Sequence, residues 1–270
     1  HSKTIFEFDN FVDKLRNIGV NVIVINDNNN YDTPDSVFPN NWISFHQNDS
    51  IVIYPMNAEN RRNERRKDIL QILNDKYLFN FKRIYDYSKY EKNSKFLEGT
   101  GSMVLDRVNK ICYASISERT NKSLVKVFCK EFKYKDICFS AYQNVLGKRK
   151  KIYHTNVMMC IADKFAIVCL DAVEDLSEKK KLVSSIQSTG KEIISITRKQ
   201  KNNFAGNMLQ VLGNKPHIVM SKAAYLCLTS SQKEKIQKYC PILYSDLQTI
   251  ETFGGGSARC MMAEIFLSKK

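Results

Sequence analysis

The chain has 270 residues, of which 43% are hydrophobic and 26% charged, as in an ordinary soluble globular protein. Its formal net charge is +14, from 42 Lys and Arg against 28 Asp and Glu. The basic residues are scattered along every segment, so the charge does not indicate a nucleic-acid-binding tract. Their densest cluster, 148–151, is predicted to be a solvated loop. No apolar run approaches about 18 residues and no signal-peptide pattern opens the chain, so we expect no membrane span and no secretion.

Eight cysteines are present, at positions 112, 129, 138, 160, 169, 227, 240 and 260. They form no C-x-x-C pair and have no histidine spacing suited to zinc, so no metal site is predicted. Most lie in apolar, strand-like runs, where a free thiol packs as a small apolar side chain. This usage indicates a reducing compartment, and we expect a cytoplasmic protein.

The first predicted elements are a helix over 6–18 and a buried strand over 20–25. The helix follows from apolar residues at helical spacing that end before Gly19. The asparagine-rich segment 26–30 is predicted to be a turn.

A unit of about 50 residues then recurs five times, each copy being a strand, a turn, a second strand, an amphipathic helix and a short strand. The units begin at Asn41, Ser102, Asn156, Asn207 and Ser257. In the first four units we expect second strands over 51–54, 111–114, 165–168 and 217–220, helices at about 61–75, 121–132, 176–189 and 230–239, and closing strands near 81–85, 137–140, 192–196 and 241–244.

One such unit cannot bury both faces of a small sheet, whereas five units arranged around an axis cover them. We therefore predict one α/β domain over residues 1–270, a five-bladed pseudo-symmetric α/β propeller with the start of each unit near the axis. Residues far apart in sequence would then share a site. The alternative is an inner ring that is only packed core.

Three reactive side chains lie near the starts of units: Glu98, His154 and Cys260. Cysteine and histidine within reach of each other supply a nucleophile and a general acid/base, and a carboxylate can orient the imidazole. Cys260 also follows three glycines and an arginine, whose positive charge favours a thiolate. The structural alternatives are a Gly-rich turn with a buried cysteine and a hydrogen-bonded core histidine. His46 and His217 lie inside strand-like runs and are interpreted as structural.

The motifs 97–101 (LEGTG), 153–156 (YHTN) and 254–260 (GGGSARC) resemble signatures of the guanidine-modifying, or pentein, superfamily. Its members include arginine deiminase, dimethylarginine hydrolase and amidinotransferases. The resemblance covers nearly the whole chain and is closer to the citrulline-utilisation hydrolases, because of the runs 38–42 (FPNNW) and 203–208 (NFAGNM). The run 60–65 (NRRNER) is also similar to that branch.

The resemblance implies the pentein fold, with Cys260 as nucleophile, His154 as general acid/base and Glu98 holding His154. It implies no metal and no organic cofactor. Such families begin with a strand ahead of the first helix, and this chain begins at what reads as that helix. Either the chain is trimmed at that strand or the ring closes without it.

Relatives that act on guanidinium groups place carboxylates at two substrate-facing positions, which here are Asn41 and Asn156. A buried guanidinium needs anionic partners, whereas an amide offers a donor and an acceptor without charge. The two asparagines thus favour the ureido group of citrulline over arginine. The alternative is that both cap turns. Asn207 and Ser257 are further substrate-binding candidates.

The α-carboxylate of an amino-acid substrate needs a cation, and an arginine can bind it through two parallel hydrogen bonds. Arg119 resembles the carboxylate-binding arginine of arginine deiminases, and Arg61 and Arg62 are further candidates. The alternative for the run 61–66 is a solvated start of a helix.

We therefore expect a cysteine-dependent hydrolase of the ureido C–N bond of L-citrulline, which yields ornithine, ammonia and carbon dioxide through an S-carbamoyl enzyme. Backbone or asparagine amides would stabilise the oxyanion. Arginine or a methylated arginine is the alternative substrate, and a non-catalytic basic protein that binds RNA is the alternative from another class. The expected partner is a small molecule and not nucleic acid; a homo-oligomer is left open.

Overall fold

The computed structural model describes residues 2–27 and 32–270, so the predicted turn at 26–30 lies largely outside the described residues. Helix α1 (Ser2–Asn17) buries Phe11, Val12 and Leu15 on one face, as their spacing predicts. Among the described residues, no helix is long and apolar enough to cross a membrane.

Four of the five repeated units each form a three-stranded sheet, in which the second strand is central, antiparallel to the first and parallel to the third. The sheets consist of β1 (Ile43–His46), β2 (Ser50–Ile53) and β3 (Arg83–Asp86); β4 (Val104–Asp106), β5 (Ile111–Ser115) and β6 (Lys135–Phe139); β9 (Met159–Ile161), β10 (Phe165–Val168) and β11 (Glu192–Ser195); and β12 (Leu209–Leu212), β13 (Pro216–Ser221) and β14 (Ile242–Ser245). Central strands are apolar and buried, because neighbours cover both of their faces. The repeat pattern is confirmed for these four units.

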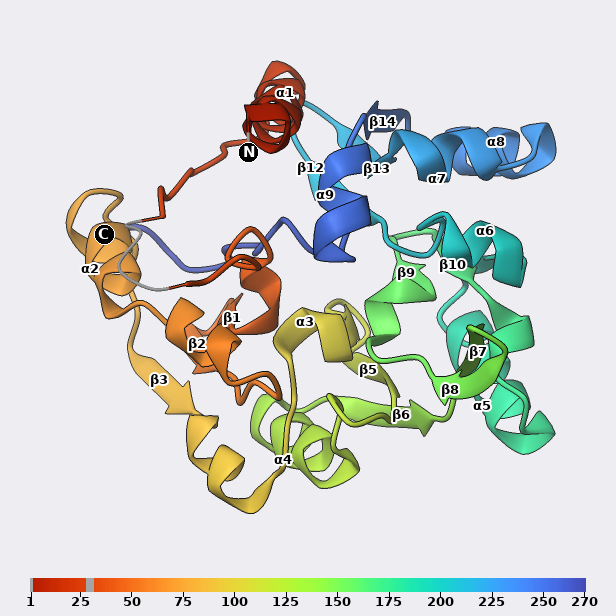
Figure 1. Cartoon of the computed structure of the whole chain (residues 1–270), viewed down its shortest axis with the longest axis horizontal. Coiled ribbons are helices and arrows are strands. Elements are labelled where there is room, and N and C mark those ends of the chain that lie inside the picture. The colour runs from red at the N-terminus through yellow and green to blue at the C-terminus, as the bar shows by residue number, and fades with distance from the viewer. Residues whose placement is uncertain (1, 28–31) are drawn as a thin grey trace.

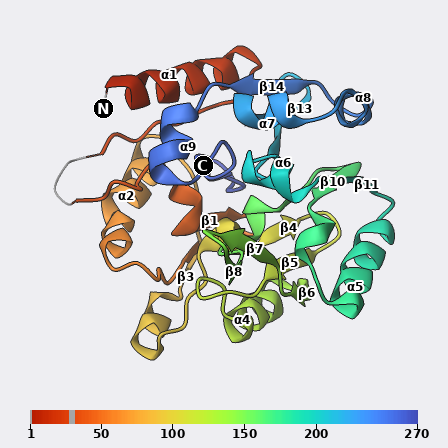
Figure 2. The ribbon, with the colours of Figure 1, turned by 45° about the vertical axis from the view of Figure 1, so that its right-hand side comes forward.

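A helix connects the second and third strands of each sheet. These helices are α2 (Lys67–Asp75), α4 (Lys122–Phe132), α5 (Leu176–Gln187) and α8 (Ser230–Gln237). Figure 1 shows the sheets following one another around a common centre with these helices on the outside, and Figure 2 shows α1 beside β14. The helix predicted at 61–75 is divided into the 3-10 helix η2 (Asn60–Glu64) and α2. The helix predicted at 230–239 is preceded by α7 (Lys222–Cys227).

The fifth unit forms no sheet among the described residues, so the five-bladed propeller is not confirmed. Both 20–25, predicted as a strand, and 261–267 lack strand pairing. The C-terminal end pairs with the segment 78–80: the amide of Asn80 donates to the carbonyl of Ser268, and the amide of Lys270 donates to the carbonyl of Leu78, both at 2.8 Å. In the other units the central strand pairs with both of its neighbours, and within 2–27 and 32–270 no such strand lies between these two segments.

The remaining elements lie mostly at the starts of units. The short helix α3 (Gly99–Ser102) contacts both η1 (Pro39–Asn41) and η4 (Thr155–Val157) at the centre, where the sequence predicts that unit starts meet. The others are α6 (Arg198–Asn202), α9 (Gln248–Gly254), η3 (Ser88–Asn93), η5 (Leu170–Ala172) and the hairpin of β7 (Tyr142–Val145) and β8 (Lys148–Lys151). The cluster 148–151 is therefore a strand, not a loop, although all four of its residues are exposed.

All eight cysteines are free thiols, and most are buried. Cys160, on β9, is representative: burial raises the pKa of its thiol to about 12, so it packs as a neutral apolar side chain.

Buried His46 makes stability depend on pH. Burial, and then the charges of Arg107 and Lys110, lower the pKa of His46 from 6.5 to about 3. Since the unfolded chain binds this proton first, the free energy of unfolding falls as pH drops through that window, by up to about 1.4 kcal/mol per pH unit from this residue. Urea unfolding of His46→Gln at several pH values should show a shallower fall than the parent. Parallel curves would contradict this.

Candidate active site

Glu98 and His154 form a buried pair at the centre of the molecule. Glu98 precedes α3, His154 precedes η4, and His154 Nε2 lies 2.6 Å from Glu98 Oε2. The two elements are joined because the hydroxyl of Thr155 donates to the carbonyl of Ser102 at 2.6 Å. The carboxylate of Glu98 contacts Nε2 of His154, so this hydrogen bond fixes the orientation of the imidazole ring.

Burial determines how this pair is charged. Burial lowers the pKa of His154, although the hydrogen bond and charge of Glu98 oppose this effect. Burial alone would raise the pKa of Glu98, but His154, Arg119 and the backbone N–H of Asn57 together lower it. We therefore assign an ionised Glu98 and a neutral imidazole that donates from Nε2, which leaves Nδ1 free to accept a proton.

Cys260 is 5% exposed and its sulfur faces two side-chain amides. Nδ2 of Asn156 lies 3.4 Å from Sγ, and Nδ2 of Asn207 lies 3.3 Å from it. Amide donors stabilise negative charge on the sulfur. Asn156 belongs to η4, two residues after His154, so the same short helix places both the imidazole and one thiol contact.

The guanidinium of Arg259 is bonded to groups other than the thiol of Cys260. It donates to the carbonyl of Met262 at 2.9 Å and pairs with Glu264 at 3.1 Å. The groups that contact Sγ of Cys260 are therefore amides.

The glycine run ahead of Cys260 holds the loop against the first unit. Helix α9 ends at Gly254, and Gly255 adopts φ +66°, a left-handed conformation that favours glycine. A Cβ at Gly254 or Gly256 would lie 2.8 or 2.7 Å from the ring of Phe38, so only glycine permits this contact. The hydroxyl of Tyr153 donates to the carbonyl of Gly255 at 2.8 Å and ties the loop to the histidine motif.

Asn41 is held in one orientation by a buried ion pair. Arg61, 4% exposed, binds both carboxylate oxygens of Glu64 at 2.7 and 2.9 Å and donates to Oδ1 of Asn41 at 2.9 Å. Because a guanidinium only donates, the oxygen of the amide must face Arg61. Nδ2 of Asn41 is consequently buried without a hydrogen-bond partner among the described residues.

Asn156 shows the complementary arrangement. Its Nδ2 faces Cys260, and its Oδ1 is buried without a partner in the described part of the chain. A Cβ at Gly101 would collide with the amide of Asn41 and lie 3.0 Å from Nδ1 of His154, so Asn41 and His154 are close to each other. Neither asparagine caps a turn. The site thus has an unused donor, an unused acceptor, a thiol and an imidazole.

The other residues predicted to bind substrate differ in whether a substrate could reach them. Arg119, 34% exposed, lies 3.6 Å from Glu98, and its guanidinium is 5.4 Å from the ring centroid of Tyr153. Arg62 is 28% exposed and pairs with Glu91 at 3.4 Å. Both have exposed surface that a carboxylate could reach.

Three candidates are engaged by the protein itself. Ser257 donates to Glu251 at 2.6 Å, and Asn207 uses Oδ1 to accept from the amide of Arg259 at 3.0 Å. Arg61 is likewise fully engaged, so a solvated start of a helix is the wrong interpretation of that residue. Sequence reasoning missed Glu64; its i,i+3 spacing from Arg61 was the available signal.

Replacing Arg61 by methionine should destabilise the protein strongly. Glu64, 3% exposed, would be left as a buried charge without its partner, at a cost of about 3–5 kcal/mol in the free energy of unfolding. The double variant Arg61→Met, Glu64→Met removes that charge and should recover most of the loss in urea unfolding. Equal stability of the single and double variants would contradict a buried ion pair.

Among residues 2–27 and 32–270, no group of three or more His, Cys, Asp or Glu side chains could hold a metal ion.

Known structures share this fold. The apo structure of ArgZ, an arginine dihydrolase from the ornithine–ammonia cycle in cyanobacteria, matches with a TM-score of 0.73 at 16% identity, over 97% of this chain and 37% of that chain. AgrE in a ternary complex with ornithine and NAD+ matches with a TM-score of 0.74 at 17% identity, over 100% and 35%. A dimethylarginine dimethylaminohydrolase variant, as an adduct with S-methyl-L-thiocitrulline, matches with 0.68 at 14% identity, over 96% and 87%.

The chain therefore spans little more than a third of the ArgZ and AgrE chains, and these matches establish its α/β fold. No curated protein sequence matches it. The family model for N,N dimethylarginine dimethylhydrolase, eukaryotic, matches residues 1–267. The chain thus belongs to the eukaryotic N,N-dimethylarginine dimethylhydrolase family, within the pentein superfamily.

Proposed function

We propose that this chain hydrolyses the ureido C–N bond of L-citrulline. The observation that supports this choice is the orientation of Asn41, whose open atom is the donor Nδ2. A ureido oxygen accepts from that donor, whereas a guanidinium carries only donors and would leave two N–H groups facing each other. Oδ1 of Asn156 accepts from the ureido NH2 group. The buried carboxylates Glu64 and Glu98 are already paired within the protein.

The proposed reaction uses the residues in the following order. Sγ of Cys260 attacks the ureido carbon, while Nδ1 of His154 takes the thiol proton and Asn41 stabilises the oxyanion. The C–N bond to the ornithine side chain breaks as His154 protonates the departing amine, which leaves an S-carbamoyl enzyme. His154 then deprotonates water, which attacks the carbonyl and breaks the C–S bond. The released carbamate decomposes to ammonia and carbon dioxide.

The α-carboxylate of the substrate is proposed to bind Arg119, which is the most exposed of the candidate arginines. Arg62 is the second candidate. We also propose that residues 1–270 act as one domain in a reducing compartment, which the free thiols support.

The second candidate function is hydrolysis of arginine or N,N-dimethylarginine. The family match favours it, because the family is named for the methylated substrate. ArgZ, with which the fold is shared, is an arginine dihydrolase. Against this candidate stand the two asparagines where a buried guanidinium requires anions. A non-catalytic binding protein is disfavoured because Glu98, His154 and Cys260 are all present and each is buried.

The test is separate incubation with citrulline, arginine and N,N-dimethylarginine, with ornithine, citrulline and ammonia quantified. We expect ornithine from citrulline and little consumption of either guanidino compound. Citrulline accumulating from arginine or dimethylarginine, with citrulline itself left intact, would reverse the assignment.

A further inference from the structure

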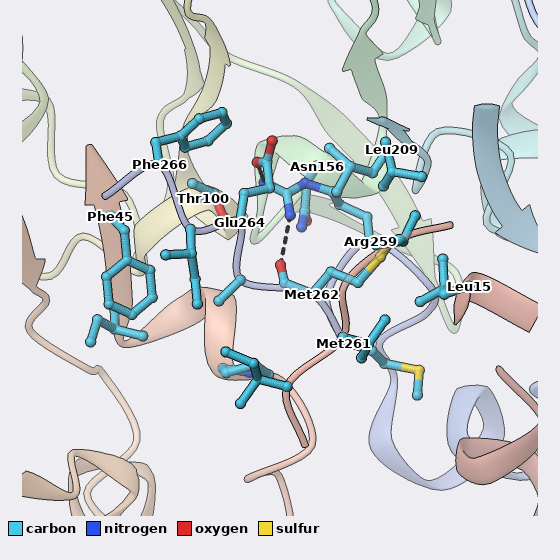
Figure 3. Close-up of a pocket in the computed structure, with 18 of the residues that line it drawn as sticks. Leu15, Phe45, Thr100, Asn156, Leu209, Arg259, Met261, Met262, Glu264 and Phe266 are labelled. Carbon is cyan, nitrogen blue, oxygen red and sulfur yellow. Dashed lines mark hydrogen bonds and ion pairs between the residues drawn. The ribbon is translucent and has the colours of Figure 1, made fainter. Parts of the chain in front are cut away.

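The thiol of Cys260 lies on a turn that begins at Ser257. The amide of Cys260 donates to the carbonyl of Ser257 at 2.9 Å, which closes the turn. The segment that follows lines a pocket of about 1260 Å³, and Figure 3 shows Met261 and Met262 in its wall. Because the chain beyond Cys260 borders this space, the position of the turn depends chiefly on contacts made ahead of the thiol.

Glu251, on α9, is the buried acceptor for this turn. Its side chain is 9% exposed, and its Oε1 accepts from the hydroxyl of fully buried Ser257 at 2.6 Å. The hydroxyl of Ser221, at the end of β13, also bonds to the carboxylate. Burial raises the pKa of Glu251, and the two hydroxyl contacts offset this only in part. A buried contact of this kind is costly to break, because it would leave polar atoms without partners.

Helix α9 is itself fixed at both ends. At its start the carboxylate of Glu7, on α1, accepts from the amides of Thr249 at 2.9 Å and Ile250 at 3.1 Å, in the manner of an N-terminal cap. At its end the amide of Gly255 donates to the carbonyl of Glu251 at 3.2 Å. The carboxylate of Glu251 is therefore presented to the turn from a fixed position.

We propose that Glu251 is a positioning residue that holds Cys260 against the amides that contact its sulfur. Ser257 transmits the effect, since its hydroxyl bonds to Glu251 and its carbonyl to the amide of Cys260. Sγ lies 3.4 Å from Nδ2 of Asn156 and 3.3 Å from Nδ2 of Asn207, and a shift of the turn by about 1 Å would break both contacts. The inference rests on the proposed function only in that Cys260 is the nucleophile, and not on which substrate is hydrolysed.

The first experiment compares Glu251→Ala with Glu251→Gln in the full chain. The readouts are kcat and KM for whichever of citrulline, arginine and N,N-dimethylarginine the parent hydrolyses. For the alanine variant we expect kcat to fall at least about 30-fold while KM changes by less than about threefold, because the turn carries the nucleophile and not the arginines proposed to bind the α-carboxylate. The oxygen of a glutamine amide accepts from Ser257 and its NH2 group donates to Ser221, so this variant should stay within about threefold of the parent.

The second experiment measures the rate constant for alkylation of Cys260 by iodoacetamide at pH 7, followed by mass spectrometry of the peptide. It should fall at least about tenfold in Glu251→Ala and recover in Glu251→Gln, because the amide contacts favour the reactive thiolate. Ser257→Ala breaks the same bond by removing only a hydroxyl, so it should lower the rate constant in the same way even if Glu251→Ala does not fold. If the parent hydrolyses none of the three substrates, the proposed function fails, while alkylation still tests this inference.

The matched control is Glu178→Ala. On the outer helix α5, Glu178 accepts from the amide of Ser140 at 2.7 Å, so its loss removes a comparable contact in another unit. The control should lower the melting temperature and leave kcat and the alkylation rate constant within about twofold of the parent. Three results would each overturn the proposal: equal losses in Glu178→Ala, which would reflect stability; a full loss in Glu251→Gln, which would indicate a role of the charge; or alkylation that is unchanged or faster in Glu251→Ala.

Discussion

Replacing Cys260 by alanine is expected to lower kcat for citrulline by at least about 10⁴-fold, since loss of the nucleophile in a covalent mechanism removes the step that the other residues assist. The protein should still fold, because the substitution removes a single sulfur atom, which accepts hydrogen bonds from Asn156 and Asn207. The measurement is ornithine release by the purified variant, together with acid quench and mass spectrometry of the parent enzyme. The parent should carry one carbamoyl group on Cys260, and the variant should carry none.

The matched control is Cys240→Ala, a buried thiol outside the site. Its turnover should stay close to that of the parent, because its role is packing. If the Cys260 variant kept activity within about tenfold of the parent, covalent catalysis by this thiol would be wrong. If the Cys240 variant lost activity equally, the loss would reflect instability, which a melting curve would show.

Replacing Asn41 by aspartate should shift the preference for citrulline over arginine by at least about 100-fold toward arginine. One carboxylate oxygen can keep the contact with Arg61, while the other replaces the donor Nδ2 by an anionic acceptor. That oxygen would face the ureido oxygen unfavourably and a guanidinium favourably. The measurement is kcat/KM for each substrate with the parent and the variant.

Asn41→Ala provides the comparison. It removes the donor without adding charge, so citrulline turnover should fall while arginine turnover gains nothing. If the ratio of kcat/KM for citrulline to kcat/KM for arginine were unchanged in the aspartate variant, the amide of Asn41 would not determine substrate preference. Similar losses on both substrates in the two variants would mean that Asn41 acts only as structural support.

Periodicity predicted the regular part of this molecule well. Alternating short strands and amphipathic helices are local signals, so the four sheets and the outer helices follow from sequence. Whether 20–25 forms a strand cannot be predicted from its own residues, because a strand forms only when a partner segment elsewhere in the chain pairs with it. The prediction of a loop at 148–151 is wrong because this exposed strand is made of charged residues. A strand that pairs only in a hairpin and buries no side chain has no hydrophobic pattern from which to predict it.

In the candidate site, too, some features could be predicted from the sequence and others could not. Reactive residues at unit starts were predicted to meet; Glu98 contacts His154, and Asn156, two residues further along, contacts Cys260. What the sequence did not reveal is that Arg61 is engaged by Glu64 and Asn41, since pairing of buried side chains depends on rotamers and depth. Arg61 accordingly changes from a candidate ligand for substrate to the group that orients an amide.

That orientation has a consequence for how the site can change. A free asparagine side chain exchanges its oxygen and nitrogen by a half-turn, but here the half-turn would set an NH2 group against a guanidinium. Rotation of the Asn41 side chain alone therefore cannot change the substrate selectivity. The effects of substitutions at 41, 61 and 64 should depend strongly on one another. A lineage that changes its substrate would have to alter these positions in a constrained order.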